Sequence, residues 1–363
     1  MSKLVKDQYL VSSFFTFFLI HSSQIGAGIL GFQTYISKDA RQDAWIPLLV
    51  AGGTIHLIIW LLYKTLDEEH IDLIAIHHYC FGKIIGNLFS IFVMIFFLFE
   101  TLTVFRTYIE IIQVWVYPYV KTWQLGIIFA LVMYYFVSSG FRVLTGFSFW
   151  GVILPSILLI TLYFPLQHAK PLYLFPMFEH SMKDLFLSFK ASTYLFLGFE
   201  WILLYYPFIK DRERSSKYAH FGNLYSTILY LIAALVSFVY FNQEVLQEIP
   251  WATLQMVKIV MFPFIERFEY IFIFLWLLVI ISPLCISIWS CTRIVKRITP
   301  VHPKVILITL LCIVLVSASG IKDWDEVEML GGITSATGFY FIYLYIPLLF
   351  LIKQLKKGVS RAR

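Results

Sequence analysis

The stretch Ser22-Ser23-Gln24-Ile25-Gly26-Ala27-Gly28-Ile29-Leu30-Gly31-Phe32 decides how this chain folds. It lies inside an apolar run from Tyr9 to Ile36, yet it contains three glycines and several small polar side chains. Each glycine destabilises a helix interior by about 1 kcal/mol relative to alanine. Backbone that leaves helical geometry inside a bilayer persists only where protein buries it or where it lines a cavity. Two interpretations follow, which are close packing against another helix and an opening that binds a ligand.

The composition identifies an integral membrane protein. Of the 363 residues, 60% are hydrophobic and 14% are charged, whereas a soluble domain typically has about 25% charged residues. The apolar runs are long enough for helices and lack the short alternating pattern of an outer-membrane barrel. The net charge of +6 comes without a basic cluster interleaved with aromatic residues, so nucleic acid is not an expected partner. The expected partner is the lipid bilayer.

The sequence suggests no catalytic residues, no metal site and no cofactor. The four cysteines have neither C-x-x-C pairing nor zinc spacing, and there is no nucleotide-binding loop or nucleophile elbow. His70, His77 and His78 lack carboxylate or thiolate partners at metal spacing, and we interpret them as solvated loop histidines. We therefore predict that the chain is not an enzyme.

Windows of about 20 apolar residues predict ten transmembrane helices in one membrane domain, residues 1–363. These spans lie near residues 9–36, 44–64, 86–116, 123–141, 145–164, 188–209, 218–241, 268–292, 304–320 and 333–352. About twice as many lysines and arginines fall on the side of the N-terminus as on the other side. This bias predicts that both termini are cytoplasmic, with a short tail over residues 353–363.

Ten spans divide into two sets of five, and an odd number of spans places the second set upside down. The repeats cover about 9–164 and about 188–352, which makes spans 1 and 6 equivalent. In transporters with inverted repeats, substrate binds where two corresponding helices are interrupted. Span 6 contains Ser192–Glu200, which places a glycine and an ionisable glutamate near the middle of an apolar helix. We therefore predict discontinuous helices 1 and 6, and this match favours the binding interpretation of Ser22–Phe32.

Four ionisable side chains fall at membrane depth, where each costs roughly 3 kcal/mol or more on insertion scales. Arg106 and Glu110 stand four residues apart on one helical face, so they form either a self-neutralised pair or part of a ligand site. Glu100 and Glu200 have no basic residue nearby in sequence. Each could hold a substrate amine, carry a proton or, when neutral, hydrogen-bond to an unwound backbone.

Four short motifs occur in order along nearly the whole chain. They are Ile25–Leu30 in span 1, Phe81–Gly86 before span 3, Gly198–Glu200 with Pro207 in span 6, and Trp251–Thr253 leading to Phe264–Glu269 before span 8. Together they resemble the B subunits of the nutrient germinant receptors of spore-forming bacteria, a branch of the amino acid–polyamine–organocation (APC) transporter superfamily. This chain departs from the family pattern at Gln33 and Ala252, where members usually have proline.

The resemblance implies an all-α, LeuT/APC-like fold and a subunit that senses a small-molecule nutrient, commonly an amino acid. It also implies a complex with an A-type membrane subunit and a C-type lipoprotein subunit, in the spore inner membrane or cell membrane. Two other functions remain open. One is a proton-coupled amino acid permease in which Glu100 or Glu200 cycles its protonation, and the other is a structural or ion-conducting subunit.

We predict that the nutrient binds between spans 1, 3, 6 and 8. Its carboxylate would meet backbone amides near Gly26–Gly28, where the N-terminus of a half-helix carries partial positive charge. Its amine would face carbonyl groups near Leu197 and Gly198. The predicted ligand-binding residues are Gln24, Gly26, Ala27, Gly28, Glu100, Leu197, Gly198 and Glu200.

Overall fold

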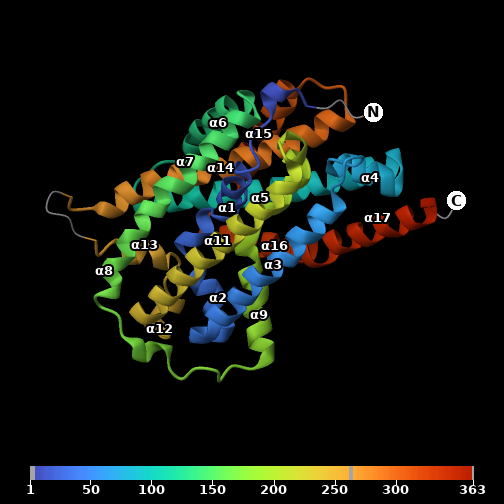
Figure 1. Ribbon diagram of the computed structural model, residues 1–363. Helices are drawn as coiled ribbons and strands as arrows, with labels where there is room; N and C mark the ends of the chain where they lie inside the picture. Colours follow the sequence, from blue (N-terminus) through green and yellow to red (C-terminus); the bar gives the residue numbers. More distant parts are fainter. Residues whose placement is uncertain (1–4, 261–264, 362–363) are drawn as a thin grey trace.

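The computed structural model describes residues 5–260 and 265–361, in which the regular elements are helices (Figure 1). Residue Phe264 of the fourth motif lies outside the described residues. The helices are α1 (Phe15–Gln24), α2 (Phe32–Ala40), α3 (Trp45–Thr65), α4 (Leu73–Phe81), α5 (Lys83–Trp115), α6 (Thr122–Ser138), α7 (Phe141–Leu158), α8 (Tyr163–Leu166), α9 (Met182–Thr193), α10 (Ile202–Tyr205), α11 (Arg212–Tyr240), α12 (Gln243–Gln247), α13 (Ala252–Val257), α14 (Phe268–Ile298), α15 (Pro303–Gly320), α16 (Trp324–Tyr340) and α17 (Ile346–Arg361).

Seven stretches of the described chain are long and apolar enough to cross a membrane, which makes this a multi-pass membrane protein. The stretches are Phe32–Thr65, Lys83–Trp115, Phe141–Leu166, Arg212–Tyr240, Phe268–Ile298, Pro303–Gly320 and Trp324–Gly358. Helix α6 is apolar but shorter, and predicted spans 9–36 and 188–209 are not continuous helices. The count of ten spans and the inverted repeat therefore stay predictions.

Two segments leave α-helical geometry at the places where the sequence predicts interruptions. After α1 the chain continues through extended backbone at Ile25 and the 3₁₀ turn η2 (Ala27–Leu30) before α2 begins. After α9 it passes through η6 (Tyr194–Phe196), extended backbone at Leu197, a left-handed Gly198 and η7 (Phe199–Trp201) before α10. We call these stretches the first break (residues 25–31) and the second break (residues 194–201).

The two interrupted segments lie against each other in antiparallel directions. Before α1, the Val11 amide donates to the carbonyl of Phe208 at 2.8 Å, and the Lys210 amide donates to the carbonyl of Val11 at 2.8 Å. At the other end, the Ser188 hydroxyl of α9 donates to the carbonyl of Ile36 in α2 at 2.6 Å. Each segment is therefore held by the other near both of its ends, and the two breaks face each other between these contacts.

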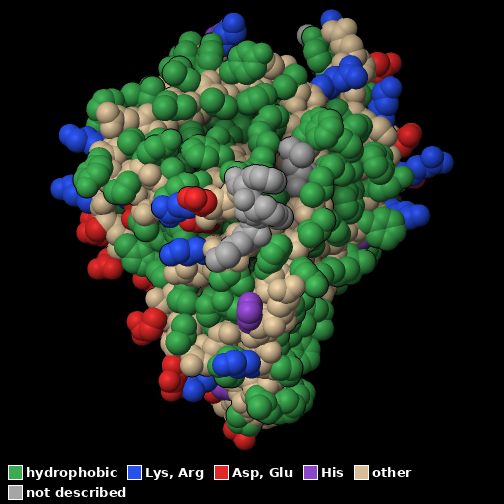
Figure 2. Space-filling model, turned by 90° about the vertical axis from the view of Figure 1, so that its left-hand side faces the viewer, with side chains coloured by type: hydrophobic (Ala, Val, Ile, Leu, Met, Phe, Trp, Pro, Cys, Tyr) green, Lys and Arg blue, Asp and Glu red, His purple; other side chains and the backbone are tan. Residues whose placement is uncertain are grey.

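Long helices enclose the breaks. Helix α5 packs along α14, α14 also packs on α7, and α11 packs on both α1 and α3. In Figure 1, α5 and α14 cross the view side by side, while α11 and α3 run obliquely across it. Figure 2 shows that hydrophobic side chains cover much of one face and that charged side chains lie mainly toward its edges, as expected for a surface in contact with lipid.

Helix α4 corrects the interpretation of the three histidines. His70 precedes α4, whereas His77 and His78 lie on it. The Asp72 carboxylate caps the start of this helix by accepting a hydrogen bond from the Ala75 amide at 2.9 Å. The prediction of a solvated side chain is wrong for His77, which is fully buried because α4 packs on α5. Its ring hydrogen-bonds to Ser90 at 2.8 Å and to the hydroxyl of Tyr345. Among the described residues no cluster of three or more His, Cys, Asp or Glu side chains could hold a metal ion.

Arg106 and Glu110 form an ion pair inside the bundle. The Arg106 guanidinium donates to the Glu110 carboxylate at 2.6 Å, and its Nε donates to the carbonyl of Ile321 at 3.1 Å. Arg106 is 1% exposed and Glu110 13% exposed. The pair thus neutralises itself within α5 and ties this helix to the chain that precedes α16.

The substitution Arg106→Met should lower the free energy of unfolding by about 3–5 kcal/mol, because it leaves the Glu110 carboxylate buried without a partner. The double variant Arg106→Met/Glu110→Leu removes both charges and should lower the free energy of unfolding much less. Thermal unfolding of the purified protein in detergent measures both. Equal losses in the single and double variants would contradict a stabilising role for the pairing.

Candidate functional site

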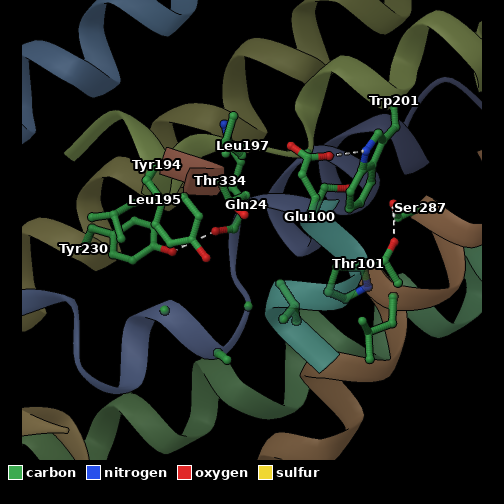
Figure 3. A pocket seen from close by; sticks show the side chains of 18 residues that line it. Gln24, Glu100, Thr101, Tyr194, Leu195, Leu197, Trp201, Tyr230, Ser287 and Thr334 are labelled. Atoms are coloured by element: carbon green, nitrogen blue, oxygen red, sulfur yellow. Dashed lines mark hydrogen bonds between the residues drawn. The ribbon is translucent and has the colours of Figure 1, made fainter. Parts of the chain in front are cut away.

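A central cavity lies where the two breaks meet. Its walls come from the end of α1, the first break, the second break and single turns of α5, α11, α14 and α16 (Figure 3). Seven of the eight residues predicted to bind ligand line it, namely Gln24, Gly26, Ala27, Gly28, Glu100, Leu197 and Gly198. The fold therefore brings residues from spans 1, 3 and 6 to one place. Glu200 is not among the lining residues.

Gln24 is held in the wall by α11. Its side-chain amide donates to the Asn223 side chain at 2.9 Å, and the Tyr230 hydroxyl donates to the Gln24 carbonyl at 2.7 Å. The carbonyl oxygen of the side chain, Oε1, is buried and has no hydrogen-bond partner within the described residues. A buried acceptor without a donor is unfavourable, so a ligand that donates a hydrogen bond here would relieve the cost.

Glu100 supplies a second acceptor of the same kind. The indole Nε1 of Trp201 donates to Glu100 Oε2 at 3.1 Å, as Figure 3 shows. The other oxygen, Oε1, is buried without a partner in the described part of the chain. Gln24 and Glu100 both line the central cavity, so its wall contains two residues that each have one unpaired side-chain oxygen among the described contacts.

Glu200 stabilises the second break instead of facing the cavity. Both of its carboxyl oxygens accept the amide N–H of Gly198, at 3.0 and 2.9 Å. Its carboxyl group also lies within hydrogen-bonding reach of the Glu100 carboxyl group. Glu200 thus adjoins Glu100, which lines the central cavity, but does not line the cavity itself.

Gly198 is required by the geometry of the crossing. Its φ of +105° lies in the region that L side chains rarely adopt, and a Cβ atom there would lie 2.6 Å from the carbonyl oxygen of Ser23. The absence of a side chain thus lets the second break pass directly over the end of α1. Gly26 differs, because a Cβ atom there would meet only the methyl groups of Val104 at 3.8 Å.

The structure adds lining residues that the sequence analysis did not select. Thr101 donates to Ser287 of α14 at 2.8 Å across the cavity wall. The sequence analysis assigned span 8 to the site but named no residue of it. A hydroxyl side chain inside an otherwise apolar span was the available signal, although such residues also pack between helices. The other unselected polar lining residues are Ser23, Tyr194, Trp201, Tyr230 and Thr334.

A larger chamber adjoins the central cavity. The central cavity leaves about 50 Å³ for water, enough for a few water molecules, whereas the adjacent chamber leaves about 290 Å³. Their shared lining residues form the partition between them and are Ala27, Gly28, Val104, Tyr194 and Leu195. The adjacent chamber also has three charged lining residues, Lys38, Asp39 and Glu328. The central cavity thus has much less free volume than the chamber beside it.

The first break is covered by the segment around α13. A Cβ atom on Gly31 would lie 2.0 Å from the carbonyl oxygen of Pro250, so Gly31 serves close packing. Gln33 donates to the Thr253 hydroxyl at 2.7 Å, which in turn donates to the carbonyl of Ile29 at 2.7 Å. The two positions that depart from the family pattern, Gln33 and Ala252, therefore lie at one contact between α2 and α13.

Comparison with known proteins identifies the family. Residues 10–327 match the family described as "Spore germination protein". The chain is 36% identical over 359 residues to spore germination protein GerQB of Bacillus cereus, covering 99% of this chain and 100% of that protein. The chain belongs to the spore germination protein family. The family predicted from the four motifs is thereby confirmed.

Other members of the spore germination protein family are more distant. Spore germination protein B2 of Bacillus subtilis (strain 168) is 24% identical and covers 73% of each chain. Spore germination protein YndE of the same organism is 21% identical over 94% of this chain and 95% of its own length. The similarity thus extends across both breaks and the helices around them, and it supports a role in germination.

Gly198→Ala should destabilise this spore germination protein by about 1–3 kcal/mol, the usual cost of a strained backbone conformation. Gly26→Ala is the matched control, since the added methyl group meets only ordinary contacts, and it should melt close to the wild type. Thermal unfolding in detergent compares the two. If Gly198→Ala and Gly26→Ala both had the melting temperature of the wild type, the close contact between Gly198 and Ser23 would not be what holds the breaks in place.

Proposed function

We propose that this chain is the ligand-sensing membrane subunit of a spore nutrient germinant receptor and that a small nutrient with an amino group binds in the central cavity. One observation carries the proposal: Gln24 and Glu100 both line the cavity, and one buried side-chain oxygen of each has no hydrogen-bond donor among the described residues. An ammonium group has three donors and a positive charge. It would satisfy both oxygens and would be attracted by the carboxyl group of Glu100.

The opposite end of an amino acid would meet the first break. The first amides of a helical turn have no partner within that turn and carry partial positive charge. Gly26, Ala27 and Gly28 bring the start of η2 to the cavity wall. A carboxylate there would accept these N–H groups, so the polar ends of a zwitterion fit the two sides of the cavity.

The small volume of the central cavity suggests how the chain would sense a nutrient. Ligand pockets usually measure about 300–1,000 Å³, so a nutrient must enlarge the central cavity to enter it. The partition formed by Tyr194 and Leu195 is the wall that separates it from the adjacent chamber. A nutrient that binds the enlarged arrangement better shifts the protein toward it, by no more than its difference in affinity for the two arrangements. That shift is the signal passed to the partner subunits.

The wider architecture belongs to the same proposal. We assign ten spans in two inverted repeats, over residues 9–164 and 188–352, within one membrane domain whose two termini are cytoplasmic. The antiparallel pairing of the two interrupted segments supports this assignment. The partners are an A-type and a C-type receptor subunit, and the location is the spore inner membrane or the cell membrane.

Gly28→Leu should abolish nutrient binding, because the added side chain fills the central cavity at the partition. Gly53→Leu is the control, since no atom lies within 4 Å of a Cβ added at that exposed glycine. Calorimetry measures the effect as the binding of a panel of amino acids, sugars and nucleosides to the purified receptor complex. Nutrient binding by Gly28→Leu with unchanged affinity would place the ligand elsewhere.

A second candidate function is a proton-coupled amino acid permease. The observation that favours it is that the carboxyl groups of Glu100 and Glu200 lie within hydrogen-bonding reach of each other beside the central cavity. A carboxyl pair that gains and loses a proton as substrate arrives is a recurring device of transporters. The two functions differ in whether the nutrient crosses the membrane.

Glu100→Gln should weaken nutrient binding by about tenfold to a hundredfold, the value of a hydrogen bond to a charged group. Glu213→Gln, at an exposed glutamate, should bind like the wild type. In liposomes, we expect no uptake of the labelled nutrient by the wild-type complex. Uptake that follows an imposed pH gradient and disappears in Glu100→Gln would establish the permease in place of the sensor.

A further inference from the structure

A second polar cavity lies at the end of the bundle where α6 and α14 end and α15 begins. These three helices pack on one another (Figure 1), and the cavity between them measures about 360 Å³. Four basic side chains line it, Arg293, Lys296 and Arg297 from α14 and Lys304 from α15. We call this cavity the basic pocket. It shares no lining residue with the central cavity.

The helices direct these charges to one place. Arg293, Lys296 and Arg297 are spaced three and four residues apart, so they share one face of α14. Lys304 stands in the first turn of α15, which starts at Pro303. The N-terminus of that helix adds partial positive charge to the same cavity. The pocket is therefore more positive than its four side chains alone imply.

Negative charge around the pocket is insufficient to balance it. The Asp72 carboxylate lies 3.1 Å from Arg297 and 3.8 Å from Arg293, and it already caps α4 through the Ala75 amide. Lys296 donates only to the carbonyl of Val301, at 3.3 Å, among its described contacts. The buried Nε of Arg293 has no hydrogen-bond partner in the described chain. One carboxylate is thus shared by Arg293 and Arg297, and the buried Nε of Arg293 remains without an acceptor among the described residues.

Five of the other lining residues are apolar, namely Val137, Phe208, Trp289, Pro303 and Leu307, and the remaining three are Ser138, Thr292 and His302. The Arg293 guanidinium stacks over the ring of Phe208 at 4.6 Å and lies 5.8 Å from that of Trp289. Outside the pocket, α15 continues with exposed apolar side chains, beginning with Val305 (54% exposed) and Ile308 (49% exposed). A charged cavity that opens onto an apolar helix surface matches a molecule with an anionic head and a hydrocarbon tail.

We propose that the basic pocket binds the phosphate group of an anionic membrane lipid. The phosphate accepts hydrogen bonds from Arg293, Lys296 and Lys304, and the acyl chains lie along the exposed face of α15. The general excess of basic residues on the cytoplasmic side of membrane proteins explains the presence of such residues. It does not explain their convergence on one cavity with a single shared carboxylate, an unpartnered Arg293 Nε and an aromatic wall.

The test measures lipid binding to the full-length protein by native mass spectrometry and in nanodiscs that contain phosphatidylglycerol or only phosphatidylcholine. The variant Lys296→Gln/Lys304→Gln changes two exposed side chains, so folding is preserved. It should bind phosphatidylglycerol about 30-fold more weakly, given the usual contribution of each cation near an anionic lipid. Lys210→Gln/Lys217→Gln removes two exposed lysines assigned to the same side and should bind like the wild type.

Three outcomes would overturn the proposal. Equal binding of phosphatidylglycerol and phosphatidylcholine would show that charge is not recognised. Equal losses in both double variants would show that a diffuse basic surface, not the pocket, attracts the lipid. Complete displacement of the lipid by millimolar inorganic phosphate, with the same thermal stabilisation by phosphate alone, would show that the occupant is a free anion. If Lys296→Gln/Lys304→Gln weakens only the binding of phosphatidylglycerol, the result supports an anionic lipid as the occupant of the basic pocket.

Discussion

The fold depends on keeping two stretches of non-helical backbone hydrogen-bonded in the interior of the helix bundle, where buried backbone polar groups must be paired. The carboxyl group of Glu200 does this for the second break by accepting the amide of Gly198 with both oxygens. The missing side chain of Gly198 then allows that break to lie directly on the end of α1. Without this pair of features the two interrupted segments could not cross, and the central cavity would not exist.

The same arrangement leaves the cavity chemically incomplete. Its walls are positioned by hydrogen bonds between neighbouring residues, with Asn223 and Tyr230 holding Gln24 and Trp201 holding Glu100. One oxygen of each residue remains without a donor. Under the proposed function, a ligand would complete these hydrogen bonds and would move the partition on entering the small central cavity.

Much of this was accessible from the sequence, although some assignments were not. Gly26, Gly28 and Gly198 marked the breaks. Glycine destabilises a helix interior, so glycines within an apolar span indicate backbone that leaves helical geometry. The four-residue spacing of Arg106 and Glu110 allowed an ion pair, but it left a role in a ligand site open. Glu200 was grouped with the lining residues, since a sequence shows that a carboxyl group lies near a break but not on which side of the backbone it lies. His77 was assigned to solvent because nothing local shows that α4 packs on α5.

The sequence by itself determined the membrane environment, the helical class, the family and the positions of both breaks, because composition and local backbone preference govern these properties. Only the tertiary structure decided which groups face the cavity. Ser287 and Glu100 lie 187 residues apart in the chain and meet at one cavity, and the basic pocket joins the ends of three helices. Such convergence arises from packing between distant segments, and the stretch Ser22–Phe32 acquires its role only when the second break lies across it.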